Sequence, residues 1–247
     1  MKLNFLSLLF FLFLIACNNE ETTSFEPLSI TNNSCEDCTT VVIEIPKALG
    51  KTKLSETINT ALQEEIIALL NFDEISHAQN INNAVVAFIN DYEELNNRFP
   101  EESMPWEASI HGSIVFENKD ILTIKLESYI FTGGAHGYGT NRFLNFEKKN
   151  GNELDLKDLF KNEDDFKLLA ESIFKQQENI PTNAEINSTG FMFETEVFSL
   201  PDNIGYTENG LQLFYEPYEI ASFADGPIIV TIPYNEANKH LNFSILP

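Results

Sequence analysis

The densest glycine cluster of the chain surrounds His136, in the segment Thr132–Gly139. Its glycines are Gly133, Gly134, Gly137 and Gly139. Because glycine tolerates positive φ angles and close backbone approach, this composition predicts a tight loop between two strands, with Gly134 or Gly137 at positive φ. An imidazole in such a loop could transfer protons as a general acid or base, or it could contact a binding partner.

A catalytic role for His136 needs a second group beside it, and a carboxylate is the natural choice. The chain has 38 Asp and Glu residues, so a carboxylate near any histidine carries little information. The sequence has no zinc signature, nucleophile elbow or dedicated carboxylate pair. We therefore expect a protein that is not an enzyme and has no cofactor or metal, and we keep a glycan-active enzyme as the alternative.

The N-terminus has the pattern of an export signal. Met1-Lys2 is followed by an apolar stretch, Leu3–Ile15, which is too short for a comfortable membrane span and fits a signal peptide. Leu14–Cys17, with the sequence LIAC, resembles the bacterial lipobox, in which the cysteine is acylated and becomes the new N-terminus. This resemblance predicts a signal peptide over residues 1–16 and lipidation at Cys17. Asn18 in place of aspartate favours an outer membrane, if the organism has one.

Cys35 and Cys38 remain as a pair in the motif CEDC. In an oxidising envelope compartment, this spacing favours a small-loop disulfide. A metal site would need two more ligands, and the sequence has no second CxxC or nearby histidine to supply them. A thioredoxin-like role would need the motif at the start of a helix, whereas here a strand follows.

The charge is the strongest compositional signal. Lys and Arg number 15 against 38 Asp and Glu, for a formal net charge of −23. Such a surface repels nucleic acid, and it attracts cations and basic proteins. We therefore exclude nucleic acid as a partner. The acidity could also serve solubility alone.

The N-terminal half predicts one strand and two helices before a hairpin. Residues 17–40 are expected to form a flexible tether, and Val41–Ile45 the first strand. Apolar residues at helical spacing predict a helix over Leu54–Leu70 and a longer one from Asp73 to Phe99, with His77 exposed near its start. Alternation from Trp106 onward then predicts two antiparallel strands with one solvent-facing side, which carries His111.

The C-terminal half predicts one helix among strands. Asn162 is expected to cap a helix whose first turn is acidic. The predicted strands after the glycine loop are Asn141–Lys148, Phe191–Phe198, Leu211–Tyr215 and Ile228–Ile232. The order of elements indicates an α+β fold, with an antiparallel sheet and helices packed on one side.

Three motifs resemble the extracellular domain shared by RsiV-type anti-sigma factors and PdaC-type peptidoglycan deacetylases. They are TGGAHG from Thr132, NFEKKNGNELDLKDLF from Asn145, and LFYEPYEIASFADGPIIVTIPY from Leu213. Their order matches that family. The resemblance implies a PdaC-like region over residues 41–105 and an RsiV-like domain over 106–247, packed together as one unit.

The chain also departs from these relatives. It lacks the transmembrane helix and sigma-binding part that an anti-sigma factor carries, and it lacks the TFDDGP-like motif of a deacetylase catalytic domain. Phe223–Pro227 resembles that motif only superficially, because the paired histidine motif is missing. The resemblance thus implies an extracellular module alone, on a lipid tether.

In RsiV-type proteins the module resembles a receptor for lysozyme, a very basic protein. This implies a binding module of the cell envelope whose partner is a basic protein such as lysozyme, or peptidoglycan. A structural lipoprotein remains a further alternative. Aromatic residues and a histidine near loops make good contact anchors. The predicted contact residues are Tyr129, His136, Tyr138, Tyr215, Pro217 and Tyr218.

Overall fold

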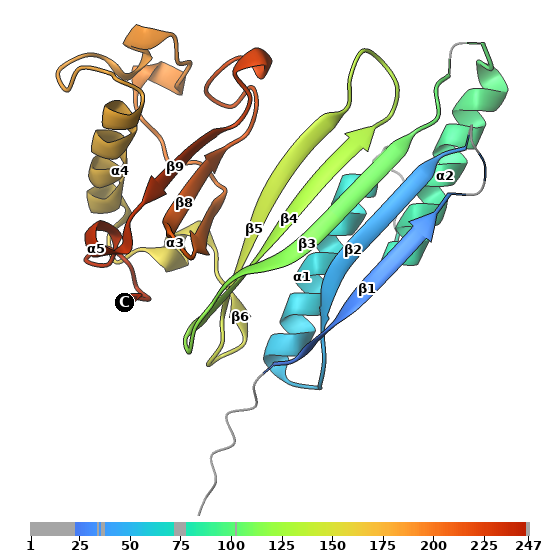
Figure 1. The fold of residues 1–247 in the computed structure, drawn as a ribbon, viewed down its shortest axis with the longest axis horizontal. Coiled ribbons are helices and arrows are strands. Elements are labelled where there is room, and N and C mark those ends of the chain that lie inside the picture. Colours follow the sequence, from blue (N-terminus) through green and yellow to red (C-terminus); the bar gives the residue numbers. More distant parts are fainter. Residues whose placement is uncertain (1–22, 34, 36–37, 72–77, 102, 246–247) are drawn as a thin grey trace, which may run out of the picture.

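A computed structural model describes residues 23–33, 35, 38–71, 78–101 and 103–245 of the chain. It contains a six-stranded sheet and a three-stranded sheet side by side, with helices against both (Figure 1). The α+β fold class is therefore confirmed. Within the described residues, none of the helices is both long and apolar enough to cross a membrane.

The larger sheet contains six strands that lie in sequence order. They are β1 (Phe25–Asn32), β2 (Thr40–Ala48), β3 (Glu107–Glu117), β4 (Ile121–Phe131), β5 (Tyr138–Glu147) and β6 (Asn152–Glu153). All neighbours are antiparallel except β2 and β3, which are parallel. The sheet is thus antiparallel as predicted except at this one pair, where two helices form the crossover that returns the chain in the same direction.

The predicted flexible tether over residues 17–40 is wrong for β1. This strand pairs with β2 along its whole length, from Phe25 opposite Ala48 to Asn32 opposite Val41. It is an edge strand whose residues are exposed or half-buried, so its composition resembles that of a loop. Cys17 lies outside the described residues.

Two helices cover one face of the larger sheet (Figure 1). The first, α1 (Lys53–Leu70), is capped by Thr52, whose side chain accepts a hydrogen bond from the Ser55 amide. The second, α2 (Ile81–Arg98), begins at the cap residue Asn80 and not at Asp73 as predicted. Asn80 offers a side-chain acceptor to the Asn83 amide, which fixes the start of the helix there. His77 lies outside the described residues.

The smaller sheet contains three antiparallel strands, β7 (Ile204–Thr207), β8 (Gly210–Tyr215) and β9 (Ile228–Ile232). The prediction missed β7 and placed a strand at 191–198 instead. That segment contains the single turn η2 (Glu194–Glu196), and Phe193 and Phe198 pack on Phe174. Its alternating apolar pattern therefore reflects burial without strand pairing.

We call the larger sheet with α1 and α2 the larger unit, and the smaller sheet with the helices around it the smaller unit. The helices of the smaller unit are α3 (Leu156–Leu159), α4 (Glu163–Gln177) and α5 (Tyr234–Ala237). Single 3₁₀ turns lie at η1 (Ile186–Thr189) and η3 (Phe223–Asp225). The predicted cap of α4 is confirmed, because the Asn162 side chain accepts from the Asp165 amide.

The buried apolar residues form two cores, and these do not follow the sequence division at 105. The core beneath α1 and α2 extends as far as Phe146 and takes buried residues from β3, β4 and β5, whereas the second core takes Phe116 of β3 and Ile121 of β4 together with residues from Leu159 onward. The two units are joined where β7 lies against β5. There Asn145 donates to the Ile204 carbonyl at 2.7 Å, and Gly205 lies directly against the Phe143 ring.

Candidate binding surface

The glycine-rich segment connects β4 to β5 as a tight loop. Gly133 has φ +101° and Gly134 has φ +85°, so the prediction of a positive φ at Gly134 is confirmed. Gly137 is not among the glycines with positive φ, and the end of the Tyr129 ring lies directly over it, where a Cβ would be. The loop thus projects His136 into solvent at the end of the larger sheet.

His136 is the end of a stack of three rings. Its imidazole stacks on Phe223 with ring centroids 4.4 Å apart, and Phe223 stacks on Tyr218 at 5.3 Å. The His136 Nδ1 lies 3.0 Å from the Gly137 carbonyl oxygen, which favours a proton on Nδ1. The stack therefore joins the loop after β4 to the loop between β8 and β9.

Tyr138, the first residue of β5, contacts the same loop between β8 and β9 that carries Tyr218 and Phe223. Its hydroxyl donates to the Pro217 carbonyl at 3.4 Å, and its side chain is 40% exposed. Burial and the nearby carboxylates of Glu216 and Glu219 raise the pKa of the Tyr138 hydroxyl. We call His136, Tyr138, Tyr218 and Phe223 the aromatic surface. Tyr129, 41% exposed, supports it through the contact with Gly137.

Tyr218 has an unusual backbone conformation for a large side chain. Its φ is +72°, in the left-handed region, and its ring is 62% exposed. A non-glycine residue in this region costs on the order of 1 kcal/mol. Neighbouring Pro217 is half-buried and contributes the carbonyl that accepts from Tyr138.

Tyr215 is not part of this surface, and its prediction as a contact residue is wrong. It is 0% exposed, and its ring packs on Phe174 and Phe193. Its hydroxyl donates to the Ser199 carbonyl at 2.7 Å, and burial raises its pKa well above the ordinary value. The alternation of β8 points it into the core, where no partner can reach it.

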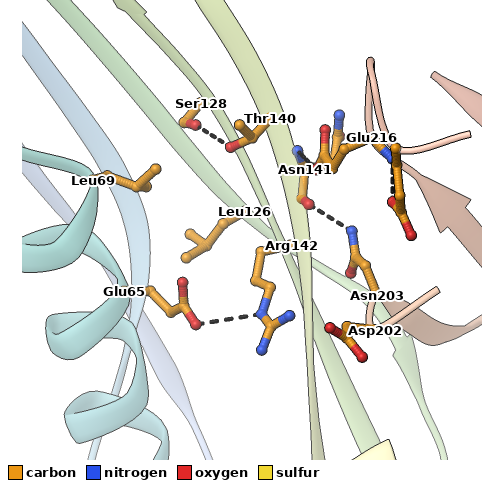
Figure 2. A pocket seen from close by; sticks show the side chains of 11 residues that line it. Glu65, Leu69, Leu126, Ser128, Thr140, Asn141, Arg142, Asp202, Asn203 and Glu216 are labelled. Carbon is orange, nitrogen blue, oxygen red and sulfur yellow. Dashed lines mark hydrogen bonds and ion pairs between the residues drawn. The ribbon is translucent and has the colours of Figure 1, made fainter. Parts of the chain in front are cut away.

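A cleft of about 290 Å³ opens between α1, the edge of β5 and the smaller unit (Figure 2). We call it the edge cleft. Glu65 of α1 and Arg142 of β5 form an ion pair across it at 3.3 Å. On the opposite wall, the Asn203 side chain donates to the Asn141 carbonyl at 2.6 Å and accepts from the Phe143 amide at 2.9 Å. Asn203 thus takes the place of a neighbouring strand along this part of β5.

Carboxylates dominate the electrostatics of the edge cleft. Glu216 accepts from the Asn141 amide at 3.0 Å, and Glu219 accepts from the Glu216 amide at 2.8 Å. Burial raises the pKa of both carboxyl groups, and these hydrogen bonds oppose the rise. Asp202 also lines the cleft.

Within the described residues, no cluster of three or more His, Cys, Asp or Glu is arranged to hold a metal ion. Cys35 and Cys38 form a disulfide with their Cα atoms 5.2 Å apart. It closes the connection between β1 and β2, far along the chain from the aromatic surface.

The sequence prediction omitted several residues of this region. Phe223, Glu216 and Glu219 lie within the motif that begins at Leu213, and Phe223 could have been found there as an aromatic residue between Ser222 and Asp225. Glu65 and Arg142 carry no such signal, because only the packing of α1 beside β5 brings them together.

Two family models match separate parts of the chain. Residues 32–138 match the family described as deacetylase PdaC, and residues 157–235 match DUF3298, a protein family of unknown function. No curated protein matches the chain.

Two crystal structures of DUF3298 family proteins have the same fold. The protein from Bacteroides fragilis superimposes with a TM-score of 0.71 at 18% identity, covering 90% of this chain and 94% of its own. The protein from Pseudomonas aeruginosa PAO1 gives a TM-score of 0.68 at 20% identity, covering 92% of this chain and 98% of its own. The chain is therefore similar to PdaC in its N-terminal part and to DUF3298 in its C-terminal part, which is the order that its motifs predicted.

Proposed function

We propose that this chain is a lipid-anchored binding module of the bacterial cell envelope, and that it captures a basic wall-active protein such as lysozyme. The PdaC and DUF3298 matches support an extracellular envelope domain. The lipobox-like Leu14–Cys17 supports the anchor, on an outer membrane where the organism has one.

The aromatic surface is the observation that carries the proposal. Its rings come from both units of the chain, and three of them stack while Tyr218 remains largely exposed. Exposed aromatic rings on strained backbone are typical of contact sites, because folding alone gains little from them. The net charge of −23 complements a basic partner and accelerates its association.

The test is surface-plasmon binding of lysozyme to the purified chain at low and high salt. We expect binding that weakens as salt increases, because screening shortens the reach of the charges. Tyr138→Ala and Tyr218→Ala should speed dissociation by about tenfold, as expected for truncated contact anchors. Phe99→Ala is the matched control, since Phe99 is 52% exposed at the end of α2.

Two outcomes contradict the proposal. If lysozyme does not bind, lysozyme is not the partner, and a pull-down with purified peptidoglycan tests the other ligand class. If other basic proteins bind equally well and neither tyrosine matters, the interaction is charge attraction without a specific surface.

The PdaC description supports a second candidate, a deacetylase acting on wall glycans. His136 would be its proton-transfer group, and its described contacts are the Gly137 carbonyl and the Phe223 ring. Release of acetate from acetylated peptidoglycan fragments, lost in His136→Ala, would support this candidate over a binding module.

A further inference from the structure

The edge cleft and the aromatic surface are adjacent. Tyr138 belongs to the aromatic surface, and its hydroxyl is influenced by the charges of Glu216 and Glu219, which line the cleft. The Tyr138 hydroxyl also donates to Pro217, the residue between Glu216 and Tyr218. A partner that covers the rings would therefore also cover the mouth of the cleft.

The lining of the cleft has an excess of negative charge. Arg142 is paired with Glu65, which leaves the carboxylates of Asp202, Glu216 and Glu219 without a basic side chain among the other lining residues. The raised pKa values of Glu216 and Glu219 indicate that their charges are partly desolvated. A cation placed in the cleft would relieve this cost.

Two buried acceptor atoms in the cleft have no donor. Glu216 Oε2 and Asn141 Oδ1 are both inaccessible to solvent, and among the described residues neither accepts a hydrogen bond. They belong to residues that are themselves in contact, through the hydrogen bond from the Asn141 amide to Glu216 Oε1. Buried polar atoms are nearly always satisfied, so this pair shows that the wall of the cleft behind its carboxylates is rich in acceptors and short of donors.

We propose that the edge cleft binds a cationic side chain, a lysine ammonium or an arginine guanidinium, of the partner that docks on the aromatic surface. Both groups carry only N–H donors and a positive charge, which match the carboxylates of Asp202, Glu216 and Glu219 that line the cleft. Their apolar stems would lie along Leu69 and Leu126, which line the same cleft. This inference rests on the proposed function for the identity of the partner.

The first test compares charge-matched variants in lysozyme binding at one fixed salt concentration. Glu216→Gln and Glu219→Gln each remove one charge from the cleft and keep an amide oxygen as acceptor. Glu93→Gln removes one charge from the exposed side of α2 and is the matched control. We expect the two cleft variants to weaken binding about tenfold, mainly through faster dissociation, and the control to change it less than about twofold.

The same assay identifies the cation. Lysozyme with acetylated lysines and lysozyme with blocked arginines are compared on the wild-type chain and on Glu216→Gln. The modification that removes the occupant of the cleft should also remove the difference between the two chains. If the cleft variants and Glu93→Gln behave alike toward unmodified lysozyme, the inference is overturned.

A second test separates this inference from the proposed function. The purified chain is titrated with Nα-acetyl-arginine amide, Nα-acetyl-lysine amide and, as neutral control, Nα-acetyl-glutamine amide, while the amide resonances of Thr140, Asn141 and Glu216 are followed by NMR. Saturable shifts with a cationic probe, absent in the Glu216→Gln, Glu219→Gln double variant, support the cleft even if lysozyme does not bind. No shift with either cationic probe overturns the inference, whatever lysozyme does.

Discussion

At the level of single residues, Tyr218 allows a contribution to partner binding to be separated from a contribution to folding stability. Its φ of +72° suits glycine, and most of its ring is exposed, so folding gains little from this side chain. Tyr218→Gly should therefore leave the free energy of unfolding unchanged or raise it by up to about 1 kcal/mol. The same variant should speed dissociation of the partner. Denaturant unfolding measures the first effect, and surface-plasmon binding measures the second.

The matched control is Tyr218→Ala, which removes the ring and keeps a Cβ in the left-handed region. It should bind as poorly as the glycine variant and be less stable than it. A clear loss of stability in Tyr218→Gly would show that the stack with Phe223 holds the loop together, which would make Tyr218 a structural residue.

Glu216 has a predictable effect on stability as a function of pH. Burial raises its folded pKa above the unfolded value, so its contribution to stability is complete at acidic pH and is lost as pH rises through the folded pKa. Glu216→Gln replaces the carboxyl group by an amide that does not ionise, so the variant does not lose this stability as pH rises. Because the side chain is only half-buried, the gain is small, and we expect Tm to rise by about 1–2 °C at pH 7 and not at pH 4.

Scanning calorimetry at the two pH values measures this difference, with Glu93→Gln as the control that should show none. A Tm that falls at pH 7 would mean that the charged hydrogen bond from the Asn141 amide outweighs desolvation. Together with the binding test, a stabilised variant that binds less well would indicate that the cleft carboxylates are retained for recognition.

At the level of elements, the contact between β5 and β7 holds the two units together. There is no space for a side chain at Gly205 of β7, because a Cβ there would overlap the Phe143 ring. Gly205→Ala should therefore lower the free energy of unfolding by about 2 kcal/mol, the usual cost of overpacking. Urea unfolding measures it.

Gly190→Ala is the appropriate comparison, since Gly190 has φ +106° with open space around its Cα. Its free energy of unfolding should fall by only about 1 kcal/mol, because the alanine strains the backbone but overlaps no neighbouring atom. Equal losses at the two positions would show that β7 moves away from β5 at little cost, and that the interface between the units is adaptable.

At the level of the whole molecule, the proposed attachment of the chain to a membrane depends on Cys17. This residue lies outside the described part of the structure, and its acylation stays a prediction from the lipobox-like sequence. Cys17→Ala should move the protein from the detergent phase to the aqueous phase in a detergent partition experiment, because the acyl chains provide the stable anchor.

Cys35→Ala is a matched cysteine substitution and should stay in the detergent phase, since it only opens a short disulfide loop. If Cys17→Ala also stays there, lipidation at Cys17 is not what attaches the protein to the membrane.

Local features of this chain could be predicted from its sequence. The apolar spacing within Leu54–Leu70, the Asn162 cap and the strands at Leu211–Tyr215 and Ile228–Ile232 are all found in the structure. The glycine loop and its positive φ at Gly134 were also predicted. These features depend on residues a few positions apart, so the period of burial and the chemistry of caps and turns are enough to specify them.

Other features needed the tertiary structure. Tyr215 and Tyr218 are three residues apart and looked equivalent, yet one is buried in the core and the other is exposed. The parallel pairing of β2 with β3, the stack of His136 on Phe223 and the ion pair of Glu65 with Arg142 join segments far apart in the chain. Such contacts leave no periodic signal in the sequence, because they arise only when elements that are distant in the chain pack against each other and decide which side chains remain exposed.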